Sequence, residues 1–302
     1  SHSKVVLSVL LVLFCYGIGK AAIMPFHRWL PAAMVAPTPV SALLHAVAVV
    51  KAGVFSILKV VIYIFGLDEL KDLATTDFML YIGAATILLS SSIAMTKDNL
   101  KARLAYSTVS QLSYIVVGAL LASSVASAGA ALHIATHAVG KITLFFCAGA
   151  IMVASHKKNI SDMAGLGRQM PITMTAFAIG AISIIGLPPM AGTWSKWYLT
   201  IGALEADKLF IVATLMISSL LNIAYLLPIP VKAFFNTPAG DSKPWTWADT
   251  KEAPLPMLIA ISVTSVGCLA LFFYPQPLID LINLIPGVST HVEITNNLNG
   301  EG

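Results

Sequence analysis

The chain has 302 residues, of which 57% are hydrophobic and only 11% are charged, whereas about 25% of the residues of a soluble domain are charged. This composition excludes a soluble globular protein, and repeated apolar runs of about 20 residues indicate an integral membrane protein. The net charge of +4 is spread without a clustered basic face, which argues against a nucleic-acid-binding surface.

The apolar runs predict eight membrane spans joined by short polar loops. The predicted spans cover residues 5–24, 40–66, 77–96, 102–122, 130–153, 172–199, 207–234 and 254–275. Eight crossings place both termini on one side of the membrane. Lys and Arg accumulate in cytoplasmic loops, and here they gather around residues 97–103, 156–171 and 236–253. We therefore expect both termini outside the cytoplasm of a bacterial-type inner membrane, with Trp245 and Trp247 at the membrane interface.

The first two predicted spans carry bases at membrane depth. The first reads GIGKAAIMPFHRWLP, in which Lys20 stands five residues before Pro25, and proline breaks a helix because it lacks the backbone N–H donor. In the second, His45 and Lys51 are six residues apart, which places them about 120° apart around a regular α-helix. We expect that one of them lines a path while the other packs against a neighbour, or that both border a broad cavity.

The fifth predicted span, residues 130–153, has His133, His137 and Lys141 at positions i, i+4 and i+8, on one helix face. An ionisable group facing hydrocarbon costs several kcal/mol, so this face is expected to point inward. Two histidines at this spacing can also chelate Zn²⁺, but such a site needs a third or fourth ligand, and Lys141 would repel a cation. We predict no metal site.

The sixth predicted span is interrupted like the first. It reads IGLPPMAGTWSK, with Pro188, Pro189 and Gly192 shortly before Lys196. A pair of interrupted apolar segments, each beside an ionisable residue, points to an ion path in transporters built from repeats. Two ordinary proline kinks are the alternative.

Bases and acids are distributed unequally over the predicted spans. Lysines fall inside the spans at Lys20, Lys51, Lys59, Lys141 and Lys196, whereas Asp and Glu are confined to loops and span ends. A lysine at this depth must be hydrated, deprotonated or paired with a group outside this sequence, unless it snorkels to the interface, an alternative that applies most to Lys59. The chain shows no GxGxxG, Walker-type, CxxC or haem-ligand pattern, so we expect no cofactor and no redox site of its own.

Four motifs together resemble one known family. They are KAAIMPFHRWLPAAMVAPTPVSALLHAVAVVKAG, DNLKARLAYSTVSQLSY, ALHIATHAVGKITLFF and GLPPMAGTWSKW. In this order they resemble the antiporter-like subunits shared by respiratory complex I, Mrp-type cation/proton antiporters and energy-converting membrane hydrogenases. The resemblance covers nearly all of residues 4–235 and is closest to the largest complex I antiporter-like subunit and the Mrp A-type subunit, through PTPVSALLH and the two histidines of the fifth span.

The resemblance implies an all-α integral membrane fold that corresponds to the C-terminal part of a fourteen-helix, inverted-repeat subunit, with two discontinuous helices. Residues 1–66 would be the last two helices of the first repeat, and residues 67–235 the second five-helix repeat. Residues 236–302 would hold a cytoplasmic loop, one further membrane helix and a polar tail. The family helix whose glutamate pairs with the lysine matched by Lys20 has no counterpart in this sequence, so a fragment, a split gene or a degenerate subunit is expected.

The resemblance also implies roles for individual residues. The matched proton-transfer positions are Lys20, His45, Lys51, His133, His137, Lys141 and Lys196. The expected function is proton translocation, with Na⁺/H⁺ exchange left open, as one subunit among other membrane subunits of a respiratory or Mrp-type complex. The alternatives are a structural anchor that has no ion path and a carrier for organic anions, in which interior lysines would supply counter-charges.

Overall fold

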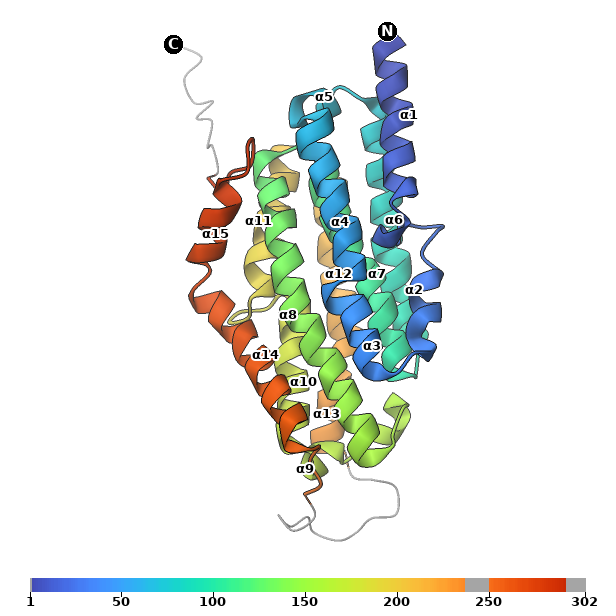
Figure 1. Ribbon diagram of the computed structural model, residues 1–302, viewed down its shortest axis with the longest axis vertical. Helices are drawn as coiled ribbons and strands as arrows, with labels where there is room; N and C mark the ends of the chain where they lie inside the picture. The colour runs from blue at the N-terminus through green and yellow to red at the C-terminus, as the bar shows by residue number, and fades with distance from the viewer. Residues whose placement is uncertain (1, 237–249, 292–302) are drawn as a thin grey trace.

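Long, roughly parallel helices make up most of the molecule, which is elongated along their common direction (Figure 1). The computed structural model describes residues 2–236 and 250–291, and no β-strand occurs among them. The α-helices are α1 (His2–Gly17), α2 (Trp29–Ala32), α3 (Thr38–Ala42), α4 (Val49–Val60), α5 (Leu67–Lys71), α6 (Ala74–Thr96), α7 (Leu100–Leu120), α8 (Ser124–Ser155), α9 (Leu166–Gln169), α10 (Pro171–Ile185), α11 (Gly192–Glu205), α12 (Leu209–Leu226), α13 (Pro228–Phe235), α14 (Leu255–Phe273) and α15 (Gln276–Asn283). Short 3₁₀ turns lie at Gly19–Ala21, Ala33–Val35 and Ile160–Met163, and π-helical turns at Leu43–Val47 and Val61–Phe65.

Five helical segments are long and apolar enough to cross a membrane. They are Thr38–Phe65, Ala74–Thr96, Ser124–Ser155, Leu209–Phe235 and Leu255–Phe273. Each of the eight predicted spans coincides with helical structure, although α1 and α10 are shorter apolar helices. The chain is thus a mainly helical integral membrane protein, while the count of eight crossings stays a prediction. The predicted interfacial Trp245 and Trp247 lie outside the described residues.

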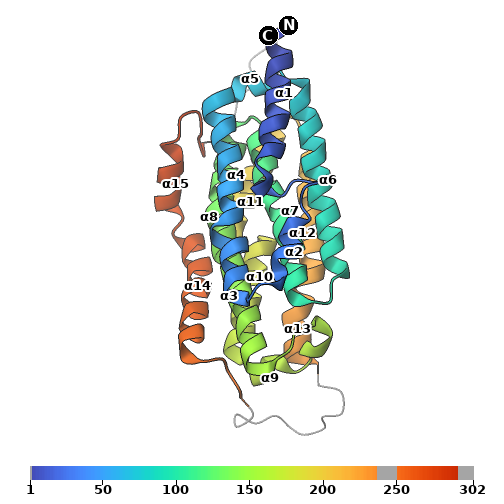
Figure 2. The same ribbon diagram turned by 45° about the vertical axis from the view of Figure 1, so that its right-hand side comes forward.

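Helix α8 runs through the middle of the bundle, and Figure 2 shows α14 and α15 along one side. Its 32 residues extend about 48 Å, more than the roughly 30 Å of a hydrocarbon core. Ser123 caps its start by accepting a hydrogen bond from the amide of Ala126 at 3.2 Å. Small residues let other helices approach it closely, because a Cβ on Gly129 would lie 2.7 Å from the backbone nitrogen of Leu199 in α11.

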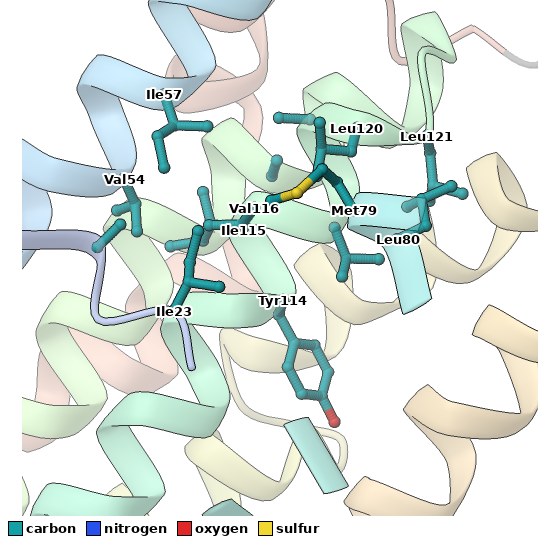
Figure 3. Close-up of a cluster of buried hydrophobic side chains, with 14 of the residues drawn as sticks. Ile23, Val54, Ile57, Met79, Leu80, Tyr114, Ile115, Val116, Leu120 and Leu121 are labelled. Carbon is teal, nitrogen blue, oxygen red and sulfur yellow. The ribbon is translucent and has the colours of Figure 1, made fainter. Parts of the chain in front are cut away.

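Apolar side chains fill the space between the helices. One buried cluster joins α4, α6 and α7 and includes Val54, Met79 and Leu120. Figure 3 shows this cluster, with Tyr114 at its edge and the ring pointing away from the other labelled side chains. A second cluster contains Phe145 of α8 together with residues of α10 and α12. Tyr114 therefore connects an apolar core to the polar interior described below.

The backbone leaves the helical path at both of the predicted breaks. Helix α1 ends at Gly17 and regular helix resumes only at Trp29; α10 ends at Ile185 and α11 begins at Gly192. Other elements take up backbone groups freed at the second break. The amide of Ala191 donates to the carbonyl of Cys268 in α14 at 2.9 Å. This pairing satisfies a polar group that lipid could not.

The turn between α6 and α7 is tied to the segment after α8. The carboxylate of Asp98 accepts hydrogen bonds from the amide and the hydroxyl of Ser161, at 2.9 Å and 2.7 Å. These hydrogen bonds, chiefly the one from the Ser161 hydroxyl, hold the pKa of Asp98 below its usual value. The depressed pKa means that this stabilisation is present at neutral pH and is lost as the pH falls through the folded-state value.

We therefore expect Asp98→Asn to lower the melting temperature in detergent by about 2–4 °C at pH 7, because the charged acceptor is removed. At a pH below the folded-state pKa of Asp98, the variant and the unmodified protein should melt together. The control is Asp162→Asn in the same segment, since the Asp162 carboxylate makes no hydrogen bond among the described residues. Circular dichroism at 222 nm checks both; equal melting of all three proteins at pH 7 would contradict the assignment.

Candidate functional site

A direct contact joins two of the predicted site residues. The Nζ atom of Lys51 on α4 lies 2.7 Å from Nδ1 of His137 on α8, although the residues are 86 positions apart in sequence. Both side chains are buried, with 6% and 1% of their surface exposed. Amine and imidazole can each carry or accept a proton, so this contact permits a proton to pass directly from one to the other.

The histidine one turn before His137 is held from two sides. His133 Nδ1 lies 2.8 Å from Ser195 Oγ of α11, and Nε2 lies 3.1 Å from Gln111 Oε1 of α7. An amide oxygen only accepts, so in this orientation Nε2 carries the proton. The rings of His133 and His137 are 5.7 Å apart between centroids. The two histidines therefore share one buried face of α8, as their spacing predicts.

Lys141 starts a chain of hydroxyl groups that leads to α12. Its Nζ donates to Ser107 Oγ at 2.7 Å and to the carbonyl of Leu104 at 3.3 Å. The hydroxyl of Tyr225 lies 2.9 Å from Ser107 Oγ and donates to the side-chain carbonyl of Asn222. Lys141, Ser107, Tyr225 and Asn222 are all fully buried. A fully buried amine is thus in contact with groups that can both donate and accept hydrogen bonds.

Lys196 lies beside the second helix break and is half-buried. Its Nζ donates to the carbonyl of Ile185, the last residue of α10, at 2.8 Å, and to Ser219 Oγ at 3.2 Å. The break frees that carbonyl, so the lysine satisfies a backbone group that the interrupted helix leaves open. Nζ also lies 5.0 Å from the ring centroid of Tyr114, a cation–π distance.

Tyr114 stands next to both His133 and Lys196. Its ring stacks on that of His133, with centroids 5.6 Å apart and planes 16° from parallel. The side chain is fully buried. The Tyr114 ring therefore contacts both His133 of α8 and Lys196 of α11.

Two predicted site residues are not joined to the others. Lys20 is exposed on the 3₁₀ turn Gly19–Ala21 in the part of the chain that the structure describes, and its place at membrane depth stays a prediction. Lys59, which is not one of the predicted site residues, is also exposed, with its ammonium group 5.8 Å from the Phe55 ring centroid. His45 is fully buried against the Phe145 ring, 5.3 Å between centroids, and neither ring nitrogen has a hydrogen-bond partner among the described residues.

The regular-helix angle between His45 and Lys51 does not hold in the structure. His45 lies in the π-helical turn Leu43–Val47, and the α-helix restarts only at Val49. Both side chains contact α8, at Phe145 and at His137 respectively. The estimate of 120° assumed a uniform α-helix, which the π-helical turn interrupts.

Carboxylates are absent from this buried network. No Asp or Glu is among the buried residues of the described ranges. The ion pairs among the described residues are peripheral: Lys4–Asp72 at 3.7 Å, Lys71–Asp68 at 3.3 Å and Lys208–Asp77 at 2.6 Å. Within the described residues, the interior polar network thus contains bases, hydroxyls and amides only.

Three residues of the buried network are not among the predicted site residues. Gln111 and Tyr114 contact His133, and Tyr225 contacts Ser107. Ser107, Gln111 and Tyr114 are spaced i, i+4 and i+7, which places them on one face of α7. That spacing is the signal that could have identified the α7 residues; Tyr225 has no comparable pattern.

Known proteins resemble the chain in sequence and in fold. The family described as NADH:quinone oxidoreductase/Mrp antiporter, TM, matches residues 1–222. NADH-quinone oxidoreductase subunit N of Desulforudis audaxviator (strain MP104C) is 35% identical over 282 residues, which cover 89% of this chain and 55% of the relative. The chloroplastic NAD(P)H-quinone oxidoreductase subunit 5 of Lotus japonicus is 38% identical over 196 residues, 62% of this chain and 25% of the relative. The chain thus spans about half of the first relative and a quarter of the second.

Two solved structures share the fold. The Mrp complex from Dietzia sp. DQ12-45-1b gives a TM-score of 0.80 at 23% identity, covering 89% of this chain and 57% of that one. The membrane-bound sulfane sulfur reductase (MBS), described as an archaeal respiratory membrane complex, gives 0.76 at 25% identity, covering 90% and 45%. The helical arrangement described above is therefore a known one.

Proposed function

Because the chain belongs to the NADH:quinone oxidoreductase/Mrp antiporter transmembrane family, we propose that it translocates protons as one subunit of a multisubunit membrane complex. The match confirms the family that the four sequence motifs indicate. The observation that carries the proposal is the 2.7 Å contact between Lys51 and His137 inside a buried network that contains bases and, within residues 2–236 and 250–291, no carboxylate.

Protons would move along this network in steps between neighbouring groups. Lys51 exchanges a proton with His137, whose ring lies 5.7 Å from that of His133. Lys141, one helix turn further along α8, and Lys196 of α11, which contacts the same Tyr114 ring as His133, extend the route. Two unit charges about 8 Å apart interact by roughly 2 kcal/mol at an effective dielectric constant near 20. Protonation of one group therefore disfavours protonation of the next, which couples the steps.

Two further residues belong to the proposal with separate roles. Lys20 is exposed at the first helix break, where a segment outside this sequence would provide its acidic partner. His45 is buried and lies six residues before Lys51 in the sequence. Its ring packs against that of Phe145 on α8. In the proposal, Lys20 connects the network to neighbouring helices, and His45 relays protons through water to Lys141.

The proposed architecture follows the family comparison. The chain would cross the membrane eight times, with discontinuous helices at Pro25 and at Pro188–Gly192. Residues 1–66 would close a first repeat, residues 67–235 would form the second, and residues 236–302 would add a loop, a helix and a tail. Both termini would lie outside the cytoplasm. Driving energy would come from redox-active partner subunits or from an existing H⁺ or Na⁺ gradient.

A matched pair of lysines on one helix tests the proposal. In membrane vesicles that carry the assembled complex, Lys51→Gln is expected to slow ΔpH formation about tenfold, equivalent to about 1.4 kcal/mol in the barrier. Glutamine is similar in size and can still donate a hydrogen bond to His137, but its amide does not take up or release a proton. Lys59→Gln changes an exposed lysine eight residues further on the same helical segment and should leave the rate unchanged.

Native gel electrophoresis of the same membranes separates transport from assembly. Reduced assembly with an unchanged rate per complex in Lys51→Gln would favour a structural anchor and contradict the proposal. Repeating the assay with Na⁺ replaced by choline decides between proton translocation alone and Na⁺/H⁺ exchange, because only exchange requires Na⁺.

A further inference from the structure

A separate cavity of about 840 Å³ opens at the end of the bundle where α8 finishes. Its wall is apolar and comes chiefly from Phe145, Gly149 and Met152 of α8 and from Met257 and Ala260 of α14. A cavity of this size is within the range of small-molecule sites. It lies apart from the Lys51–His137 contact and takes no part in the proposed proton route.

The rim of this cavity is positively charged. Lys101, Lys157 and Lys158 line it, and its lining residues in the part of the chain that the structure describes include no Asp or Glu. The fold brings the start of α7, which carries Lys101, next to the segment after α8, which carries Lys157 and Lys158, because the amide of Leu100 donates to the carbonyl of Lys158 at 3.0 Å. Lys101 donates to the carbonyl of Ala36 at 2.7 Å, and an ammonium group has two more protons to donate.

The apolar surface that α8 contributes to the cavity is followed along the chain by the positively charged Lys157 and Lys158. Helix α8 continues for ten residues from Phe145 to its end at Ser155, about 15 Å along the helix, and Lys157 follows two residues later. Two of the lining residues, Val35 and Val153, are 95% and 51% exposed, and exposed apolar side chains of a membrane protein fit an opening toward lipid. A ligand that matches this gradient has an anionic group at one end and a long apolar part at the other.

We propose that the cavity binds one anionic phospholipid. Its phosphate contacts Lys101, Lys157 and Lys158, and one acyl chain lies against the wall formed by α8 and α14. Basic cavities between membrane helices are known to bind anionic headgroups. The apolar wall adds selectivity for a lipid over a free phosphate ion, since each buried CH₂ contributes to binding.

Lipid binding to the purified, delipidated complex tests this inference by native mass spectrometry. Dioleoyl-phosphatidylglycerol should bind once per chain at this site, whereas dioleoyl-phosphatidylcholine and inorganic phosphate should not compete with it. Lys157→Gln/Lys158→Gln should weaken phosphatidylglycerol binding about 30-fold, because each lysine near a lipid surface contributes about fivefold. Lys4→Gln/Lys71→Gln, which removes two exposed lysines outside the cavity, should leave binding unchanged.

A second variant addresses the apolar wall. Ala260→Trp fills the cavity beside α14 and should displace the lipid, while Ala270→Trp places the same side chain at an exposed position of the same helix and should not. Equal binding of phosphatidylcholine, competition by inorganic phosphate, or unchanged binding in either cavity variant would overturn the proposal. Retained melting temperature in detergent confirms that each variant is folded.

Discussion

Replacing Lys141 with Ala is expected to lower the rate of ΔpH formation about a hundredfold in vesicles that carry the assembled complex, equivalent to about 2.7 kcal/mol. Lys141 is fully buried, and its ammonium group is in contact with the Ser107 hydroxyl at 2.7 Å and the Leu104 carbonyl at 3.3 Å. Alanine removes the one amine that contacts Ser107 among the described residues. Ser107 then retains Tyr225 as a neighbour but has no base from which to receive a proton.

The control for this prediction is Lys141→Gln. Glutamine can still donate to Ser107, so packing and assembly should be close to normal, yet transport should fall as far as in the alanine variant. A structural-anchor role for the buried bases predicts the reverse, with normal transport per complex and reduced assembly. Near-normal ΔpH formation in Lys141→Ala would remove Lys141 from the obligatory path.

The second large effect is expected for His137→Leu, which should also slow ΔpH formation about a hundredfold. His137 contacts Lys51 at 2.7 Å on one side and adjoins the His133 ring at 5.7 Å on the other. Leucine has a similar volume and preserves the packing of α8, but it interrupts the chain between α4 and the rest of the network. His291→Leu, at an exposed histidine away from the network, should have no effect.

Combining His137→Leu with Lys51→Gln gives a sharper version of this test. If the two residues act as one unit, the double variant should be no slower than His137→Leu alone, because the same step is already lost. Multiplied effects, about a thousandfold in total, would show that Lys51 and His137 act on independent routes. Vesicle ΔpH measurements normalised to assembled complex distinguish the two outcomes.

The local pattern of α8 was sufficient to orient its polar face. The i, i+4, i+8 spacing of His133, His137 and Lys141 depends only on helix geometry, and all three side chains are buried as predicted. The prolines and glycines near Lys20 and Lys196 likewise predict where the helical backbone is interrupted, because the missing N–H is a property of the residue itself. Four motifs in order were sufficient for the family.

Partners across the bundle were decided only by the tertiary structure. Lys51 and His137 are 86 residues apart, and Ser107 and Tyr225 are 118 apart, so no periodicity relates them. The same holds for the exposure of Lys20, which depends on which helices pack over it and not on its place in an apolar run.

The sequence by itself therefore determined the membrane class, the family and the inward face of α8, because each follows from local chemistry along the chain. Only the packing of α4, α7, α11 and α12 around α8 decided which base contacts which. It also brought Lys101 beside Lys158 at the rim of the apolar cavity. Contacts of this kind depend on how helices cross and on local departures such as the π-helical turn at His45, which residue periodicity does not encode.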